Sequence, residues 1–131
     1  MTQEHLAKLN SIDHASLRIA RKYSEGLGDN LMTCLVFTTE MRTLQGTYPL
    51  LMQQIEGHPA PLPLALLGLQ KNENLFLDES DLGWRTETIP LMMQKGPFYI
   101  AKEQDSTGVT RNVIALDESH PKLGLECGER L

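Results

Sequence analysis

Histidines are the side chains of this sequence with the widest chemical repertoire. Four are present, at positions His5, His14, His58 and His120. A facial-triad iron site uses two histidines and a carboxylate, commonly as His-x-Asp followed by a distant histidine, and many zinc hydrolases carry His-Glu-x-x-His. Neither pattern occurs here, where the local contexts include IDHAS, EGHPA and ESHPK. We therefore predict no metal site and no cofactor.

Signatures of an activated nucleophile are also missing. No Gly-x-Ser-x-Gly motif occurs, and Cys34 lies in the apolar run LMTCLVF, which raises a thiol pKa rather than lowering it. The carboxylates of Asp78, Glu79 and Asp81 share a glycine-containing segment, which favours a solvated turn over an acid/base pair. The sequence therefore favours a protein that is not an enzyme, with an enzyme as the alternative.

Composition places the chain among ordinary globular domains. It has 131 residues, of which 40% are hydrophobic and 22% charged, and this length suits one domain with a core of its own. The net charge is −5, from 17 acidic and 12 basic residues, so nucleic acid is not an expected partner. No apolar run reaches the roughly 18 residues of a membrane span.

The N-terminal residues and the cysteines bear on the cellular compartment. The opening MTQEHLAKLN lacks the apolar segment of a secretory signal. We therefore expect a cytoplasmic protein, with signal-independent export to the cell surface as the alternative. Cys34 and Cys127 form no Cys-x-x-Cys pair, and we expect a buried Cys34 without a disulfide.

Apolar patterning predicts an α+β domain. Residues 1–13 predict a flexible N-terminal arm, and residues 14–131 a single domain. Short helices are predicted at 39–45 and 90–95. Strands are predicted at 31–37, 62–70, 75–78, 97–102 and 109–117, with shorter extended pieces at 14–20 and 49–55. Short connections favour a mostly antiparallel sheet of five to six strands, flat or curled toward a barrel.

Three local expectations follow from this pattern. Residues 31–37 are apolar on both faces and should form a central strand. Residues 62–70 and 75–78 should form a hairpin, with the Asn74 side chain supporting its turn. Trp84 is either the largest piece of the core or an exposed interface residue, and the low aromatic content of 5% favours the core.

Short motifs follow one another in a fixed order along residues 14–101. They are His14 with Leu17-Arg18, Asn30, LMTCLVF, Glu40, Tyr48-Pro49-Leu50, Ala65-Leu66-Leu67-Gly68-Leu69, Glu73-Asn74-Leu75-Phe76-Leu77, Trp84, Ile89-Pro90 and Pro97-Phe98. This ordered set resembles the SapC family of bacterial proteins, and the tail GERL is similar to the family's sequence at the equivalent point. Two positions depart from the pattern. Thr88 stands where the family usually has an aromatic residue, and Gly96 where it usually has a larger one.

The resemblance implies an association with the bacterial surface layer, from which the family takes its name. Relatives encoded beside tryptophan-halogenase-like and cupin-like oxygenases imply a role in modifying proteins or peptides. Family members are typically near twice this length, so the resemblance covers their N-terminal half, and the chain is either a short member or part of a longer protein. The family carries no established catalytic residues over to this sequence.

Two functions therefore compete. The first is a non-catalytic binding or assembly module of the surface layer or of a protein-modifying system. The second is an accessory or incomplete subunit of an oxygenase or peptide-modifying enzyme, whose site another chain completes. The partner is a protein in either case, and a homodimer is one alternative. The candidate functional or interaction residues are His14, Arg18, Asn74 and Trp84. For His14, a hydrogen-bonded histidine at a strand edge is the favoured interpretation.

Overall fold

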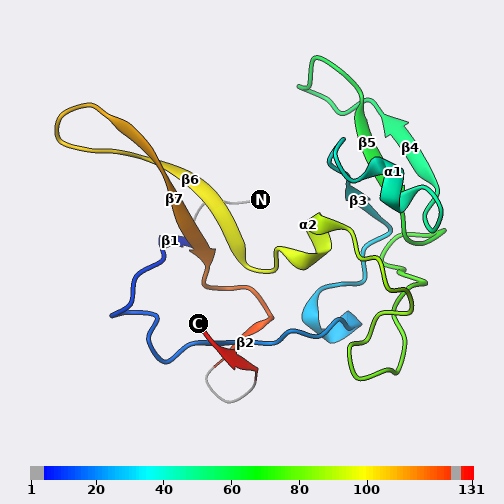
Figure 1. Cartoon of the computed structure of the whole chain (residues 1–131), viewed down its shortest axis with the longest axis horizontal. Coiled ribbons are helices and arrows are strands. Elements are labelled where there is room, and N and C mark those ends of the chain that lie inside the picture. The colour runs from blue at the N-terminus through cyan, green and yellow to red at the C-terminus, as the bar shows by residue number, and fades with distance from the viewer. Residues whose placement is uncertain (1–4, 125–127) are drawn as a thin grey trace. The chain divides into compact units, whose positions relative to one another are not determined.

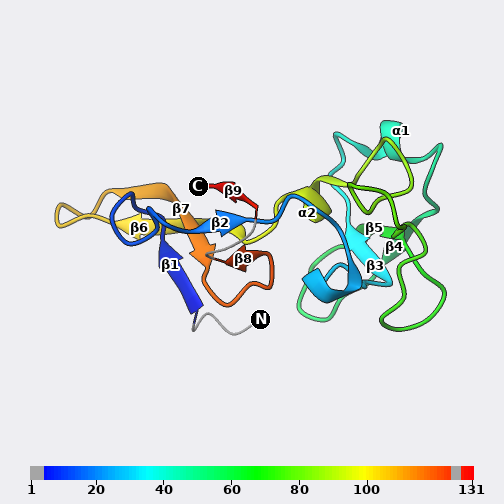
Figure 2. The ribbon, with the colours of Figure 1, turned by 90° about the horizontal axis from the view of Figure 1, so that it is seen from below.

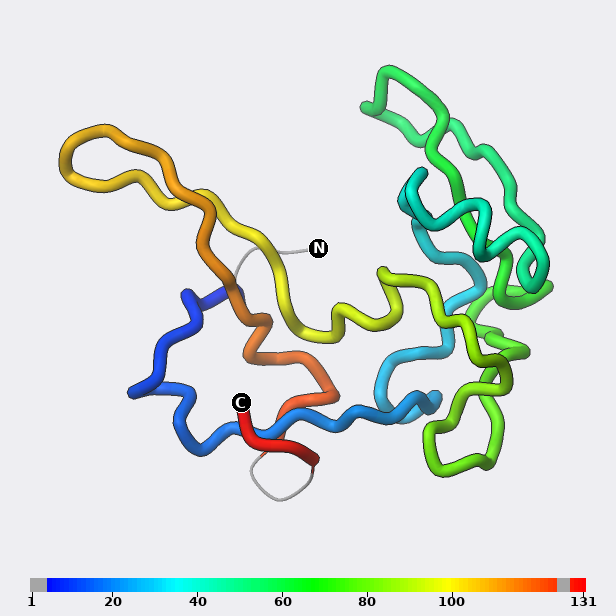
Figure 3. The backbone as a smooth tube through the Cα atoms, viewed as in Figure 1, coloured from blue at the N-terminus to red at the C-terminus, as the bar shows by residue number. Residues whose placement is uncertain are grey.

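The computed structural model describes residues 5–124 and 128–131, and the contacts of the chain divide it into two compact units (Figure 1). The terminal unit combines residues 1–21 with 95–131, and the central unit comprises residues 22–94. Figure 3 follows the chain through the terminal unit, into the central unit and back. The predicted single domain over 14–131 stays a prediction.

A long hairpin dominates the terminal unit. Strands β6 (Phe98–Gln104) and β7 (Thr110–Asp117) pair antiparallel, and β1 (Leu6–Lys8) adds to the other edge of β7. The hairpin turn forms because the Asp105 carboxylate accepts hydrogen bonds from the N–H groups of Thr107 and Val109. The strands predicted at 97–102 and 109–117 are confirmed, and β1 lies within the predicted arm.

The second sheet of the terminal unit is small (Figure 2). Strand β2 (Arg18–Ile19) lies between β8 (Leu123–Gly124) and β9 (Glu129–Arg130), antiparallel to both. Gly128 has φ +92°, and a Cβ there would lie 2.0 Å from the carbonyl oxygen of Ile19. Only glycine therefore allows the chain to turn into β9 at this point. The strand predicted at 14–20 is shortened to two residues because the preceding residues form a turn.

The central unit holds the third sheet, in the order β3-β5-β4. Its strands are β3 (Thr33–Leu35), β4 (Leu50–Gln53) and β5 (Leu62–Leu66), all antiparallel. The prediction that residues 31–37 form a central strand is wrong, because β5 is central and β3 lies at an edge. The prediction took residues 31–37 to be buried on both faces, but Leu35 at the end of β3 and Phe37 beyond it are exposed.

The two faces of this sheet differ in burial. Cys34, Ala65 and Leu50 lie side by side across the three strands and join the core, so the expected burial of Cys34 is confirmed. Cys127 lies outside the described residues. On the opposite face a second row crosses the strands, formed by Leu35, Leu64 and Leu51. Leu35 is 38% exposed and Leu51 49% exposed.

Two short helices adjoin the sheet of the central unit, as predicted. Helix α1 (Met41–Leu44) packs Leu44 and the following Tyr48 into the core, and α2 (Leu91–Gln94) contributes Met93. The Glu40 carboxylate, which precedes α1, accepts hydrogen bonds from the N–H groups of Phe37 and Leu91 at 3.1 and 3.0 Å. One side chain therefore ties the start of α2 to the start of α1. The central unit also contains a 3-10 turn, η2 (Glu25–Leu27).

The predicted hairpin of residues 62–70 and 75–78 is wrong. Strand β5 ends at Leu66, and its neighbours are β3 and β4. Gly68 then approaches the carbonyl oxygen of Glu73 so closely that a Cβ would lie 2.2 Å from it. The chain folds into a compact loop there, in which Leu75 donates its N–H to Leu67 and Leu77 forms an isolated bridge with Trp84.

The predicted single sheet is corrected to three small antiparallel sheets of three strands each. The fold is mostly β with two short α-helices, and within residues 5–124 and 128–131 no sheet closes into a barrel. Over the same residues, no helix has the length and apolar character needed to cross a membrane.

Candidate functional site

His14 is a buried side chain of the terminal unit with a partner on each ring nitrogen. It is 3% exposed. Its Nδ1 lies 3.1 Å from the Asn10 nitrogen, and its Nε2 lies 3.3 Å from Oε1 of Glu118. With the proton on Nε2, Nδ1 accepts the Asn10 N–H and Nε2–H donates to the carboxylate. A proton on Nδ1 would instead be donated to the Asn10 carbonyl oxygen, which lies 3.2 Å away.

Asn10 builds the turn that presents His14. Its side-chain oxygen accepts the N–H groups of Ile12 and Asp13 at 2.9 and 2.8 Å, and its Nδ2 donates to the Asp13 carboxylate at 2.6 Å. A side-chain oxygen that accepts N–H groups two and three residues on is the usual way for asparagine to fix a turn. The sequence N-S-I-D-H therefore positions the imidazole locally, and Glu118 holds it from far along the chain.

A cavity of about 540 Å³ adjoins His14 within the terminal unit. Its apolar wall includes Leu9 and Ala15, and Ser11 and Arg130 add polar groups. The Nε of Arg130 donates to the Ala15 carbonyl at 3.0 Å, which closes β9 against the residues that follow His14. Because both ring nitrogens of His14 are engaged, the ring offers no lone pair to a ligand in this arrangement.

Arg18 also donates a hydrogen bond to a main-chain carbonyl. It lies on β2, exposed, and its Nη1 donates to the carbonyl oxygen of Gly128 at 3.1 Å. The same carbonyl belongs to the turn whose glycine approaches Ile19. The Arg18 guanidinium thus stabilises the entry into β9 and leaves donors facing solvent.

Asn74 is the buried amide of the central unit. Its Nδ2 donates to the Asp29 carbonyl at 2.8 Å, and its Oδ1 accepts the Phe76 N–H at 3.0 Å. The Asp29 carboxylate is itself buried and accepts the Ser24 N–H at 3.0 Å. Asn74 therefore supports its own turn through the Phe76 N–H, as expected from the sequence, and it also joins two loops 45 residues apart.

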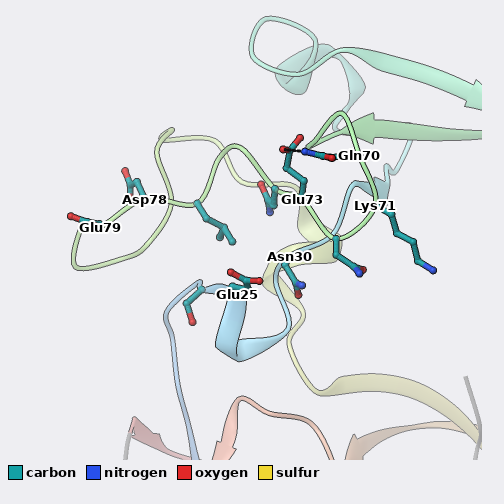
Figure 4. A pocket seen from close by; sticks show the side chains of 11 residues that line it. Glu25, Asn30, Gln70, Lys71, Glu73, Asp78 and Glu79 are labelled. Carbon is teal, nitrogen blue, oxygen red and sulfur yellow. Dashed lines mark hydrogen bonds between the residues drawn. The ribbon is translucent and has the colours of Figure 1, made fainter.

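A second cavity, of about 530 Å³, lies beside Asn74 in the central unit (Figure 4). Carboxylates from three segments line it, among them Glu25, Glu73 and Asp78, and the Lys71 side chain points away from them. Hydrogen bonds from the Leu69 N–H and the Gln70 side chain lower the pKa of Glu73.

The carboxylates of Glu73 and Asp78 have structural partners. Asp78 accepts hydrogen bonds from both the N–H and the hydroxyl of Ser80, as expected of a solvated turn. Throughout the part of the chain that the structure describes, no group of three or more histidine, cysteine or acidic residues has a geometry that could hold a metal ion.

Trp84 lies in the core, 4% exposed. Its Nε1–H donates to the Tyr48 hydroxyl at 2.9 Å, and that hydroxyl donates in turn to the Thr88 carbonyl. Its ring stacks with Phe76 at a centroid distance of 6.1 Å and meets Tyr23 edge-on at 5.2 Å. Burial raises the pKa of Tyr48, although the side-chain hydrogen bonds with Thr86 and Trp84 act to lower it. The core interpretation of Trp84 is the one that agrees with its burial.

The structure separates the four candidate residues into two pairs. His14 and Arg18 belong to the terminal unit, and Asn74 and Trp84 to the central unit. Within each pair, the two side chains form no hydrogen bond with one another. Their functional roles stay predictions, because each side chain is explained here by its structural contacts.

Comparison with known families decides the membership of the chain. The sequence model of the SapC family matches residues 9–131. The chain belongs to the SapC family. No curated protein and no solved structure matches it.

The SapC match spans both units and includes all four candidate residues. Sequence analysis missed the residues that hold them, namely Asn10, Asp29, Glu118 and Arg130. The Asn10 turn has a local signal in its spacing to Asp13. Glu118 has none, because it lies 104 residues from His14 and is brought to it only by β7. In this SapC protein, the polar groups around the first cavity are therefore assembled from both ends of the chain.

Proposed function

We propose that this SapC protein is a non-catalytic binding or assembly module that contacts a protein of the bacterial surface layer or of a protein-modifying system. One observation carries the proposal. The edge strands of the central-unit sheet expose large apolar side chains, whereas the candidate residues of the central unit, Asn74 and Trp84, are engaged in structural hydrogen bonds. The exposed side chains on and beside β3 and β4 include Leu31, Met32, Leu35, Phe37, Leu51 and Met52.

Exposed apolar side chains gathered on one element are typical of interaction surfaces, because isolated ones are normal but contiguous patches are not. Leu35 and Leu51 share one face of the sheet, with Leu64 between them. Phe37 follows two residues after Leu35 and is 51% exposed. We call Leu35, Leu64 and Leu51 the leucine row. A partner that covers the leucine row would remove these side chains from water.

The test is co-sedimentation of the purified chain with isolated bacterial surface-layer sheets. We expect the chain to sediment with the sheets, and we expect the F37S/L51S variant to lose about tenfold in apparent affinity, since two exposed apolar anchors are removed. The I100S/I114S variant is the matched control. It removes two apolar side chains of greater exposure from the β6–β7 hairpin of the terminal unit.

Equal losses in the two variants would contradict binding through the leucine row. Failure of the unaltered chain to sediment would contradict the surface-layer setting. The same comparison with a purified tryptophan-halogenase-like oxygenase then tests the protein-modifying setting. Fractionation of the source bacterium tests the proposed location, which is the cytoplasm or, after signal-independent export, the cell surface.

A second candidate function rests on His14 beside its cavity. An accessory or incomplete enzyme subunit would present this buried imidazole to a site that another chain completes. Protonation chemistry there requires His14 to release Asn10 or Glu118 first. The H14Q variant retains hydrogen-bonding groups, but its amide neither gains nor loses a proton near neutral pH. Unchanged binding together with lost product formation in the reconstituted enzyme would favour this second function over the first.

A further inference from the structure

Strand β4 presents an edge that is unprotected against pairing with another strand. It forms one side of the β3-β5-β4 sheet, and the stretch from Thr47 to Ile55 carries no charged residue. Leu51 is 49% exposed and Met52 62% exposed. Natural sheets usually guard such edges with charges, proline or bulges, as the Lys102 and Glu103 side chains do on the β6 edge.

The register within the sheet shows which main-chain groups face outward. Leu66 donates its N–H to the Pro49 carbonyl at 2.9 Å. In an antiparallel ladder, hydrogen-bonded pairs alternate with pairs that are not hydrogen-bonded. Residues 49, 51 and 53 therefore direct their main-chain groups toward β5, and Leu50 and Met52 direct theirs away from it. Among the described residues, these outward N–H and C=O groups meet no strand.

We propose that two copies of this chain pair through β4, antiparallel, about a two-fold axis at Leu51. In this register, the outward groups of Leu50 meet those of Met52 from the second copy, and the reverse pair forms by symmetry. Four intermolecular main-chain hydrogen bonds result. Leu51 then lies opposite its own copy, at a position that is not hydrogen-bonded. This is an isologous contact, in which one patch serves both copies.

The side chains fit the same register. On one face, the row of Leu35, Leu64 and Leu51 continues directly into Leu51, Leu64 and Leu35 of the second copy. On the other face, Leu50 of one copy lies beside Met52 of the other and covers a side chain that is otherwise exposed. Cross-strand apolar pairs of this kind stabilise a sheet. Both faces of the joined sheet are therefore apolar at the junction.

Charge and area define how strong the contact is. Pairing identical edges places identical side chains near one another, so any charge on β4 would repel its copy, and β4 has none. Two four-residue strands bury less than the roughly 800 Å² per partner of stable complexes. The expected dimer is therefore weak and forms as concentration rises. The inference goes beyond the proposed function, since a second copy is a different partner from the surface layer, and either can fail alone.

Disulfide trapping tests the register in the full chain. In a C127S background, the L51C variant places two thiols at a non-hydrogen-bonded pair, where Cα atoms lie about 4.5 Å apart and a disulfide fits. The matched control is Q53C, whose copies are about 13 Å apart in this register. Under mild oxidation, we expect covalent dimer at least tenfold faster for L51C than for Q53C. Equal rates would overturn the register.

Light scattering over a range of concentrations tests the contact itself. M52P removes an outward N–H that pairs with no strand among the described residues, so it should fold normally, with unchanged Trp84 fluorescence, and stay monomeric. The unaltered chain should approach the dimer mass. A folded M52P that still dimerises would overturn the β4 contact. An unaltered chain that stays monomeric at its highest soluble concentration would also overturn the β4 contact. The same conclusion holds if that monomer binds an added extended peptide instead.

Discussion

The buried side chains of Asn74 and His14 are each held at two points. Asn74 donates to the Asp29 carbonyl and accepts the Phe76 N–H, and His14 contacts Asn10 and Glu118. No buried side-chain nitrogen or oxygen among the described residues lacks a partner. An unsatisfied buried polar group costs about 1–3 kcal/mol. Such residues therefore fix loops in place whether or not they have a further role.

At the scale of single residues, the buried thiol of Cys34 predicts how the free energy of unfolding depends on pH. Burial, together with the Glu40 carboxylate, raises its thiol pKa from 9.0 to about 12. Between these two pKa values the unfolded state binds fewer protons at this group than the folded state, so deprotonation favours unfolding. The contribution is fully present below pH 9 and is lost as the pH rises toward 12. At pH 10 we expect the chain to have lost about 1.4 kcal/mol through Cys34.

Denaturant unfolding of the C34A variant beside the unaltered chain measures this loss. Both variants share the titration of the tyrosines and lysines, so only the difference in slope between pH 8 and pH 10 reports on Cys34. The stability of C34A should fall less steeply. Parallel curves would show that the thiol titrates alike in the folded and unfolded states.

At the scale of the secondary-structure elements, the loop that follows β5 is sensitive to the addition of a side chain at Gly68. Strand β5 ends two residues earlier, and the loop returns so closely that a Cβ would lie 2.2 Å from the Glu73 carbonyl oxygen and 2.7 Å from its carbon. The obstacle is main chain, which cannot rotate away. By contrast, a Cβ on Gly46, just after α1, meets nothing within 4 Å.

We therefore expect G68A to lower the free energy of unfolding by about 2–4 kcal/mol, because the loop that carries Asn74 must shift. G46A is the matched control. It should leave stability unchanged or raise it by about 0.5 kcal/mol, since alanine restricts the unfolded chain. Chemical denaturation followed by Trp84 fluorescence measures both. A stability loss in G46A as large as that in G68A would point to a general intolerance of glycine replacement.

Secondary-structure elements with a strong local sequence pattern were predictable. Strand pairings, for which the sequence gives only a weak signal, were not. The β6–β7 hairpin follows from two apolar runs around Asp105, and α1 follows from the spacing of Met41, Leu44 and Tyr48. Strand β5 was predicted despite Pro63, but its partners were not. Pro63 faces β3 just beyond the end of that strand, where its carbonyl accepts the Val36 N–H at 3.0 Å. Its missing N–H therefore leaves the three paired residues of β3 intact.

At the scale of the whole molecule, the chain has two unequal centres of burial. The main core consists entirely of central-unit residues, namely Cys34, Val36, Leu44, Tyr48, Ala65, Leu67, Trp84 and Met93. Among its described residues, the terminal unit buries fewer apolar side chains, chiefly Ala115, Leu116 and Pro97. It is also discontinuous, because residues 1–21 and 95–131 come from both ends of the chain. A linear pattern gives no signal for such a division, and the same discontinuity hid Glu118 as the partner of His14.

This inequality predicts that residues 22–94 fold on their own. The fragment contains the whole aromatic cluster around Trp84 and both helices. Domains of this size are stable by only about 3–5 kcal/mol. We expect blue-shifted Trp84 emission and a single cooperative transition in denaturant. The L44A form of the fragment, which loses a side chain only 1% exposed, should lose about 2–5 kcal/mol and unfold.

An unaltered fragment whose emission matches that of the unfolded chain would show that the central core depends on the terminal segments. A folded fragment would assign the exposed leucine row and the β4 edge to an autonomous unit. The terminal segments, with few buried apolar side chains and a hydrogen-bonded His14, would then draw their order from being tethered to it at both ends. The corresponding result in the full chain would be an H14A variant that loses structure in the terminal unit only. Its unfolding transition, followed by Trp84 fluorescence, would then stay unchanged.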